Sequence, residues 1–304
     1  MTIRFGVAGT GHWAREVHLS SLASMDGIEL TGVWGRNSAT ARDVADRFNI
    51  TAFSTFEDML AHVDAVSIAV SPVAQASLAA AAANAGKHLL LEKPLALAIS
   101  EASKVADSIA GRGVAAIVFF MRRFVPEIEA VVEAAATMSW DRAQVDVYSA
   151  AMSTESPYSE STWRQAPGAA LWDIGPHVLS ILLPVLGPVE RIEAAHHADR
   201  RTTFETIHAN GAHSAVSVTL HSDKHNAVRR YRFFSSSQCI ELPEPPFSYR
   251  AALRSAVADL LACIEHPERE HRCGIAMGTE VVRLLEVADR SARAKGSNVD
   301  SSNC

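Results

Sequence analysis

The fold of this chain is decided first by residues 9–14, which read Gly-Thr-Gly-His-Trp-Ala. They have the form G-x-G-x-x-A, follow the apolar run Ile3–Ala8, and open a segment that can be helical. Gly9 suits a tight turn after a strand, Gly11 lets a ligand approach the backbone, and Ala14 lets the helix pack closely on the strand. The free N–H groups at the start of such a helix attract phosphates. The stretch therefore predicts a turn that binds the pyrophosphate of a dinucleotide.

Length and composition indicate a globular protein of two domains. The chain has 304 residues, of which 48% are hydrophobic and 20% are charged, so it can bury a sizeable core. A net charge of −6 without a dense basic run argues against a nucleic-acid-binding protein. The four cysteines lack C-x-x-C spacing, which is typical of reduced thiols in a cytoplasmic protein. We find no signal peptide and no apolar stretch of the ~20 residues that span a bilayer, so we expect no membrane contact.

Strands and helices alternate through the first part of the chain. Apolar runs that read as strands are each followed by a helical segment, and this alternation predicts a doubly wound parallel sheet with helices on both faces. Residues 1–121 are therefore predicted to form a dinucleotide-binding domain. The expected strands are 3–8, 28–34, 51–53, 64–70, 88–91 and 114–120, and the expected helices are 12–23, 39–48 (with Ser38 as N-cap), a helix starting at the Thr55 capping box, one after Pro72, and 100–111.

The second part of the chain reads differently. A helix over residues 172–186 is followed by several extended segments that polar turns connect, which predicts an α+β domain with a mixed, mostly antiparallel, open sheet. We expect residues 122–304 to form this domain, with two helices at 251–265 and 278–294 closing it. An open sheet needs both faces covered, and the few helices here suggest that a second copy covers one of them, most simply in a homodimer, with a higher homo-oligomer as the alternative. The expected strands are 145–151, 190–196, 202–208, 215–221, 229–234 and 237–242.

The end of the second strand predicts a preference for NADP over NAD. Enzymes that use NAD usually place an acid there, about 20 residues past the glycine turn, to hold the ribose 2′-hydroxyl. Here the chain has Gly35, which removes the carboxylate that would repel a 2′-phosphate. Arg36 can offer its planar fork to that phosphate, and Asn37 adds a donor. The alternative is that Arg36 lies over the adenine or in solvent.

Glu92-Lys93-Pro94 directly follows the fifth predicted strand. Ligands of an open parallel sheet lie at the carboxyl ends of its strands, so Lys93 is expected to point at the site. The X-Pro bond there can be cis. The alternative interpretation is that the strand simply ends in a turn here and that Lys93 is solvated.

A second constellation lies in the other half of the chain. Trp163-Arg164 precedes Asp173 and His177, which are four residues apart and share a face of a helix. A carboxylate beside an imidazole can orient the ring. Pro176 is tolerable only in the first helical turn or at a kink. An N-capping aspartate with a surface histidine is the plainer interpretation.

Together these residues resemble the Gfo/Idh/MocA oxidoreductase family over nearly the whole chain. The resemblance rests on the turn at 9–14, the run 86–88 before Glu92-Lys93-Pro94, Arg123-Phe124, Trp163-Arg164, and Asp173-Ile-Gly-x-His177. It implies that Lys93, Asp173 and His177 are catalytic, with His177 as proton donor or acceptor, Lys93 hydrogen-bonded to the reacting oxygen, and Asp173 orienting substrate or histidine. The chain departs from the family at Ser71-Pro72-x-x-Gln75, where members often have Pro-x-x-His. Its glycine run at 167–170 is shortened, Ser180 stands where members often have an acid, and the chain is shorter than most members.

The resemblance also implies the remaining contacts. Substrate contacts are expected from Arg123, Trp163 and Arg164. Core packing is an alternative for Trp13 and Phe124. The expected cofactor contacts are Gly9, Thr10, Gly11, His12, Trp13, Gly35, Arg36, Asn37, Ser71, Pro72, Gln75, Glu92 and Lys93.

The sequence thus predicts an NAD(P)-dependent oxidoreductase that acts on a hydroxyl or carbonyl carbon of a small polar substrate, a sugar or polyol by resemblance. Two alternatives remain: a non-catalytic cofactor-binding regulator, and a reductase of a non-sugar carbonyl, C=C or imine on the same fold. We expect no metal, because the histidines lie on predicted strands and turns without a cysteine partner at ligand spacing. These histidines are His196, His197, His208, His213, His221 and His225.

Overall fold

A computed structural model describes residues 2–300 of the chain, and side chains through residue 295. The chain forms two compact units: one comprises the chain up to Phe124 together with Phe247–Glu280, and the other comprises Val125–Pro246 together with the chain from Val281. The first boundary lies close to the predicted one. The predicted division fails in one respect, because helix α9 (Tyr249–Glu265) belongs to the first unit. There it packs on two strands of the sheet and on the helices that follow the first strand.

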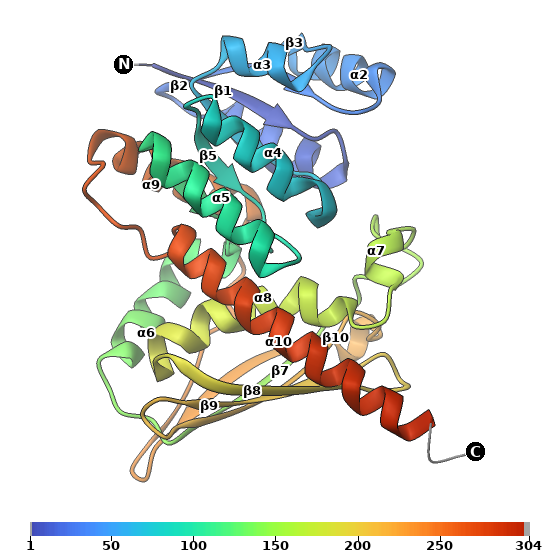
Figure 1. The fold of residues 1–304 in the computed structure, drawn as a ribbon, viewed down its shortest axis with the longest axis vertical. Helices are drawn as coiled ribbons and strands as arrows, with labels where there is room; N and C mark the ends of the chain where they lie inside the picture. The colour runs from blue at the N-terminus through green and yellow to red at the C-terminus, as the bar shows by residue number, and fades with distance from the viewer. Residues whose placement is uncertain (1, 301–304) are drawn as a thin grey trace. The chain divides into compact units, whose positions relative to one another are not determined.

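The first unit contains a six-stranded parallel sheet in the order β3-β2-β1-β4-β5-β6. Strands β1, β2, β3 and β5 of this sheet are labelled in Figure 1. The order reverses between β1 and β4, and such switch points bind the ligand in doubly wound folds. Every residue of β4 is buried, so both faces of the sheet are covered there. The strands are β1 (Ile3–Ala8), β2 (Ile28–Trp34), β3 (Thr51–Ala52), β4 (Ala65–Ile68), β5 (His88–Leu91) and β6 (Ala116–Val118).

The helix after β1 contains a π-helical turn, η1 (Ala14–Leu19), which continues into α1 (Ser20–Leu22). The prediction of Ser38 as N-cap was wrong: α2 (Ser38–Phe48) is capped by Asn37, whose side-chain oxygen accepts from Thr40 N at 3.0 Å. The Thr55 cap is confirmed, since its hydroxyl accepts from Asp58 N. The other helices of this unit are α3 (Phe56–His62), α4 (Pro72–Asn84), α5 (Ile99–Arg112) and the 3₁₀ turn η2 (Met121–Phe124).

The second unit contains a mixed sheet in the order β12-β11-β7-β10-β9-β8. Only β10 and β7 run parallel among these pairs, and the others are antiparallel. The predicted fold class, a Rossmann sheet followed by a mixed open sheet, is confirmed. The strands are β7 (Arg142–Tyr148), β8 (Val189–His196), β9 (Thr202–His208), β10 (His213–Thr219), β11 (Val228–Phe234) and β12 (Cys239–Glu241).

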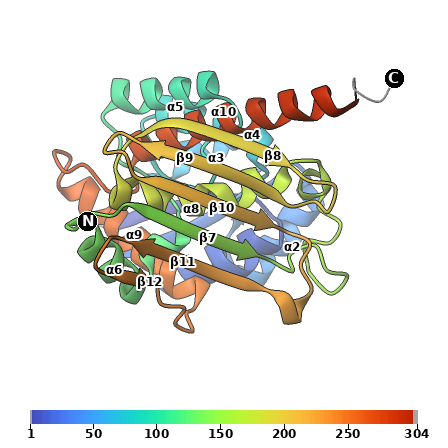
Figure 2. The ribbon, with the colours of Figure 1, turned by 90° about the horizontal axis from the view of Figure 1, so that it is seen from below.

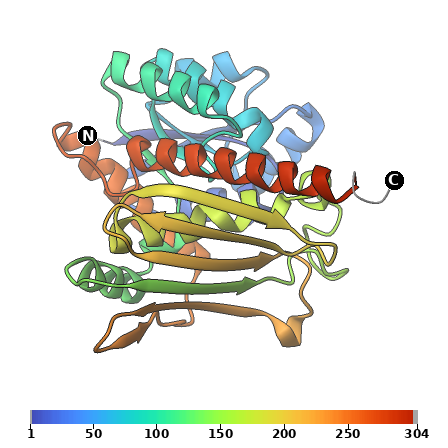
Figure 3. The same cartoon turned by 60° about the horizontal axis from the view of Figure 1, so that its bottom comes forward.

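One face of this second sheet is covered and the other is open. Helix α8 (Ala169–Leu186) contacts β7, β9 and β10 and is itself covered by α6 (Pro126–Ala136). Figures 2 and 3 show the opposite face of the sheet, on which no described element of the second unit lies. Burial alternates along β9 and β10, as expected for strands with one face in the core.

Helix α8 is long and apolar enough to cross a membrane by composition, but 83% of it is buried inside the protein, as in the core helix of a folded domain. It begins at Ala169, before the expected residue 172, so Pro176 lies in the helix interior and not in the first turn. At the neighbouring Gly175, an added Cβ would lie 2.7 Å from Leu285 of α10 (Ile275–Asp300). The glycine therefore lets the two helices approach closely.

Candidate active site

The turn after β1 can be made only by glycine at its first position. Gly9 has a φ of 135°, and a Cβ there would lie 2.2 Å from the carbonyl oxygen of Ala69. Its N–H donates to Trp34 O at 2.8 Å, which ties the turn to the end of β2. Gly11 differs, since a Cβ there would meet no atom within 4 Å. The open space over Gly11, at the start of a helix and at the switch point of the sheet, fits the pyrophosphate of a dinucleotide.

The end of β2 lies against the same turn. A Cβ at Gly35 would lie 2.6 Å from Cγ2 of Thr10, so the missing side chain at 35 also makes room for the threonine. Arg36 and Asn37 are exposed. The oxygen of the Asn37 side chain is engaged in the helix cap, which leaves its amide N–H groups as donors.

The Glu92-Lys93-Pro94 turn is held from beneath by Gln75. The Lys93–Pro94 bond is cis. The buried Gln75 side chain accepts from Glu92 N at 3.0 Å and donates to Glu92 O and, at 2.8 Å, to Pro94 O. Gln75 therefore acts on the site indirectly, by holding the backbone of this turn. Its helix, α4, is preceded by the exposed N-cap residue Ser71 and begins with the buried Pro72.

A buried carboxylate, Glu92, joins three parts of the first unit. Its Oε1 accepts from Trp13 Nε1 at 2.7 Å and lies 3.0 Å from Nε2 of His18, while its Oε2 accepts from Lys93 N at 3.2 Å. Burial alone would raise the pKa of Glu92. Hydrogen bonds from His18 and Trp13 and the neighbouring charges, Lys93 included, outweigh burial, and the pKa lies below its usual value. His18, fully buried on the turn η1, was not among the predicted site residues.

In the second unit, Asp173 is paired with Arg164. Nε of Arg164 donates to Oδ2 of Asp173 at 2.7 Å, and both side chains are largely buried, with exposures of 19% and 9%. The guanidinium also lies 4.6 Å from the ring centre of Tyr158 and 4.5 Å from that of Trp163. His177, half-buried, follows one turn later on α8. The predicted substrate arginine and the predicted catalytic carboxylate therefore form one ion pair.

The start of α8 lies against a contact between a histidine and a carboxylate. Gly168, the N-cap, has a φ of 77°, and a Cβ there would lie 2.8 Å from Nε2 of His196. That nitrogen lies 3.3 Å from Oδ1 of Asp289. Burial would raise the pKa of Asp289, but hydrogen bonds from His196 and Arg293 hold it below its usual value. The glycine is needed here both for its backbone conformation and for the close histidine.

The predicted residues thus fall into two groups, each assembled within one unit. The first holds the glycine turn, the exposed His12 at the start of its helix, the end of β2 and the Glu92-Lys93-Pro94 turn. Arg123 belongs to this unit too, buried on η2, and its carbonyl accepts from Arg272. The second group is Trp163, Arg164, Asp173 and His177. Among the side chains described, those of residues 2–295, no cluster of three His, Cys, Asp or Glu is arranged to hold a metal ion.

Residues 3–120 match the profile of the Gfo/Idh/MocA group, described as an oxidoreductase family with an NAD-binding Rossmann fold. The chain is 33% identical over 127 residues to UDP-N-acetylglucosamine 3-dehydrogenase of Acidithiobacillus ferrooxidans, covering 42% of this chain and 40% of that protein. It is 32% identical over 130 residues to a scyllo-inositol 2-dehydrogenase (NADP(+)) of Bacillus subtilis, covering 42% and 39%. These alignments span about two fifths of each relative's length.

The likeness of fold extends further. The solved structure of the Acidithiobacillus ferrooxidans enzyme superposes with a TM-score of 0.82 at 22% identity, covering 97% of this chain and 99% of that one. The glycine turn and the Glu-Lys-Pro turn lie within the matched residues 3–120, at the carboxyl ends of β1 and β5. Residues 3–120 are thus similar to the NAD-binding Rossmann domain of the Gfo/Idh/MocA oxidoreductase family.

Proposed function

We propose that this protein is an NAD(P)-dependent oxidoreductase acting on a hydroxyl or carbonyl carbon of a small polar substrate. The observation that carries the proposal is the open space over Gly11, where an added Cβ would meet no protein atom within 4 Å. Gly9 and Gly35, by contrast, are required by protein atoms close to them. A residue kept small without a protein neighbour fits a backbone that a cofactor approaches.

The cofactor would be held by the predicted residues of the first unit. The N–H groups at the start of the helix after Gly11 would receive the pyrophosphate, and Arg36 with Asn37 would meet the adenosine ribose. The nicotinamide, when bound, supplies or accepts the hydride. Ser71, Pro72 and Gln75 would support the cofactor side of the Glu92 turn.

The protein's own residues would handle the substrate oxygen and its proton. His177 would take the proton in the oxidative direction and return it in the reductive one. Lys93 would donate a hydrogen bond to the same oxygen. Asp173, oriented by Arg164, would accept a hydrogen bond from substrate or histidine, and Arg123 and Trp163 would line the substrate. That Lys93 acts together with Asp173 and His177 is part of this proposal.

The substrate class that we propose is a sugar or polyol. The two relatives named above act, by their names, on a nucleotide sugar and on an inositol. Carboxylate, imidazole and ammonium groups suit neighbouring hydroxyls, which both donate and accept.

We further propose that NADP is preferred over NAD. No acid follows β2, and the exposed Arg36 can form charge-assisted hydrogen bonds with a 2′-phosphate. The Bacillus subtilis relative is named for NADP(+).

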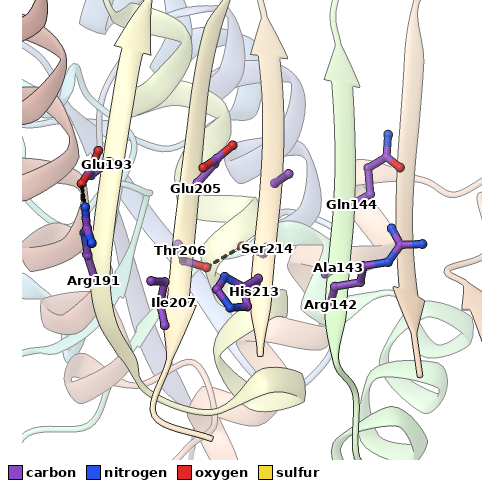
Figure 4. A pocket seen from close by; sticks show the side chains of 11 residues that line it. Arg142, Ala143, Gln144, Arg191, Glu193, Glu205, Thr206, Ile207, His213 and Ser214 are labelled. Carbon is purple, nitrogen blue, oxygen red and sulfur yellow. Dashed lines mark hydrogen bonds and ion pairs between the residues drawn. The ribbon is translucent and has the colours of Figure 1, made fainter. Parts of the chain in front are cut away.

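The open face of the second sheet supports the proposal of a homodimer. It carries a groove of about 520 Å³ over β7, β8, β9 and β10, lined by charges of both signs, among them Arg142, Arg191 and Glu205 (Figure 4). Interspersed opposite charges suit a two-fold contact, in which each patch meets its own copy. We propose a cytoplasmic location, which agrees with free thiols at Cys239, Cys263 and Cys273.

A matched pair of variants tests the cofactor site. Gly11→Val places a side chain where a Cβ would meet no protein atom within 4 Å, and Gly111→Val does the same at an exposed helical position. We expect Gly11→Val to keep the melting temperature and lose binding of NADP and NAD in a calorimetric titration. Gly111→Val should bind like the wild type. Equal cofactor binding by both variants, or none by the wild type, would overturn the proposal. Binding without turnover of any substrate would favour a regulator.

A further inference from the structure

The fully buried His18 lies in the middle of a hydrogen-bonded chain that the proposed chemistry does not use. Its Nδ1 is 2.7 Å from the hydroxyl of Ser67 on β4, and its Nε2 is 3.0 Å from Oε1 of Glu92. Ser67 is fully buried too, so its hydroxyl has no access to a substrate. The arrangement has the order of a Ser-His-Glu relay, but burial of its serine excludes a nucleophilic role. Its function must therefore lie at the other end, at Glu92.

The π-helical turn explains how His18 reaches this carboxylate. Trp13 and His18 are five residues apart and would point about 140° away from each other on a regular α-helix. The π-helical turn η1 spans Ala14–Leu19, between these two side chains and including His18, and it widens the helix by one residue. As a result both rings, whose centres are 6.5 Å apart, point their nitrogens at Oε1 of Glu92. The π-helical turn thus allows Trp13 and His18 to contact the same carboxylate oxygen.

The protonation pattern follows from the charge of Glu92. An ionised carboxylate only accepts, so Nε2 of His18 carries a hydrogen and donates to it. The low pKa of Glu92 agrees with an ionised group. Nδ1 of His18 lies 2.7 Å from the Ser67 hydroxyl, which can donate to the ring nitrogen or accept from it. The ring is therefore held at both of its nitrogens, and it orients the Glu92 carboxylate.

The second oxygen of Glu92 points toward the lysine turn. Oε2 accepts from the backbone N–H of Lys93 at 3.2 Å. The other side of that turn is held by Gln75 through the backbone of Glu92 and Pro94. The Glu92 carboxylate, which Trp13 and His18 hold through its other oxygen, thus fixes the backbone from which Lys93 projects.

We propose that His18 is a positioning residue. It holds the Glu92 carboxylate, and the carboxylate in turn fixes the Lys93 backbone relative to the helix that follows Gly11. This inference depends on the proposed function only for its catalytic consequence. Removing His18 would leave Glu92 with fewer donors and free it to turn away from Lys93 N.

The test compares His18→Leu with His18→Gln. Leucine has no donor, whereas the glutamine amide can donate to Glu92 as Nε2 does. Hydrogen exchange of the Lys93 amide, followed by mass spectrometry, reports the backbone bond without any substrate. A hydrogen bond to a charged group corresponds to roughly 10- to 150-fold in an equilibrium constant. We expect exchange to accelerate by about that factor in His18→Leu and to return close to the wild-type rate in His18→Gln.

Amides of β2 in the same sheet serve as the internal control. They should exchange at the wild-type rate in both variants. Unchanged Lys93 exchange in His18→Leu, equal acceleration in His18→Gln, or parallel acceleration of β2 would each overturn the proposal. Where a substrate is turned over, His18→Leu should lower kcat by up to about 100-fold with little change in KM, since misplacement of a catalytic group acts on the chemical step. Failure of cofactor binding in the wild type would refute the proposed function and leave the exchange test intact.

Discussion

Arg164 donates a hydrogen bond through Nε to Oδ2 of Asp173 at 2.7 Å, nine residues along the chain and from a short helix, α7 (Thr162–Gln165). The sequence suggested separate roles for the two residues, one on the substrate and one in catalysis. Their pairing means that the charge of Asp173 is already compensated within the second unit. A substrate hydroxyl would therefore meet an oriented, paired carboxylate.

The Arg164–Asp173 pair should be strongly coupled. In a double-mutant cycle with Arg164→Met and Asp173→Asn, urea unfolding should give a coupling energy of roughly 1.5–3 kcal/mol, as for hydrogen bonds to charged groups. The exposed pair Arg47–Glu16, with side-chain exposures of 52% and 31%, is the control and should give about 0.2–1 kcal/mol. Equal coupling of the two pairs would show that burial adds nothing at Asp173.

Arg36→Ala should weaken NADP binding by about 10- to 150-fold, because it removes a hydrogen bond to a charged phosphate. NAD lacks that phosphate, so its affinity should change little. The matched control is Arg42→Ala, an exposed arginine on α2 in the same part of the unit. Titration of both oxidised cofactors into the wild type and the two variants decides the matter. Tighter binding of NAD than NADP by the wild type would refute the preference.

His208 should make stability depend on pH below neutrality. Burial lowers its pKa from 6.5, against the hydrogen bond to Gly187 O, and the nearby His213 lowers it further. A lowered pKa means that the folded state favours the neutral ring, so its contribution is present above pH 6.5 and is lost as pH falls through the folded pKa.

Between pH 7.5 and 5.5 the free energy of unfolding should therefore fall, by no more than about 1.4 kcal/mol per pH unit for this one group. His208→Gln should reduce the slope, whereas the exposed His266→Gln should leave it unchanged. Urea unfolding at a series of pH values measures both. If the free energy of unfolding of His208→Gln depended on pH as strongly as that of the wild type, His208 would not cause the pH dependence.

Self-association should depend on the open face of the second sheet. Ala215 is exposed on β10 and lines the groove, so Ala215→Arg places a charge and a long side chain within the proposed contact. We expect sedimentation to give a dimer for the wild type and a monomer for Ala215→Arg at micromolar concentration. Ala110→Arg, at an exposed position of α5, should remain dimeric. A monomeric wild type would contradict the proposal.

Much of the fold follows from local patterns in the sequence. The run at residues 28–34 and the segment at 202–208 are strands with the predicted bounds, since their apolar periodicity decides their burial. Asn37 and Ser38 are both good capping residues, so only the hydrogen bond to Thr40 N distinguishes them. The return of α9 to the first unit could not be predicted either, because packing on distant strands leaves no mark in a local pattern.

The motifs of the candidate site can be read from the sequence, whereas the residues that support those motifs cannot. Glycine spacing and the Glu-Lys-Pro turn indicate the cofactor edge of the sheet by themselves. His18 gave no signal, because regular helical spacing separates it from Trp13 and only the π-helical turn η1 brings the two to Glu92. The Arg164–Asp173 pair depends on the path of the chain between two helices, which no spacing rule describes.

The most direct measurement is the absorbance of reduced nicotinamide during incubation with NADP and a panel of sugars and polyols. We predict that the wild type reduces the cofactor with at least one of them. Lys93→Ala and His177→Ala should bind NADP like the wild type and lose most of the rate, on the order of 10²–10⁴-fold for His177 as a general base. Wild-type rates in both variants on that substrate would contradict the account.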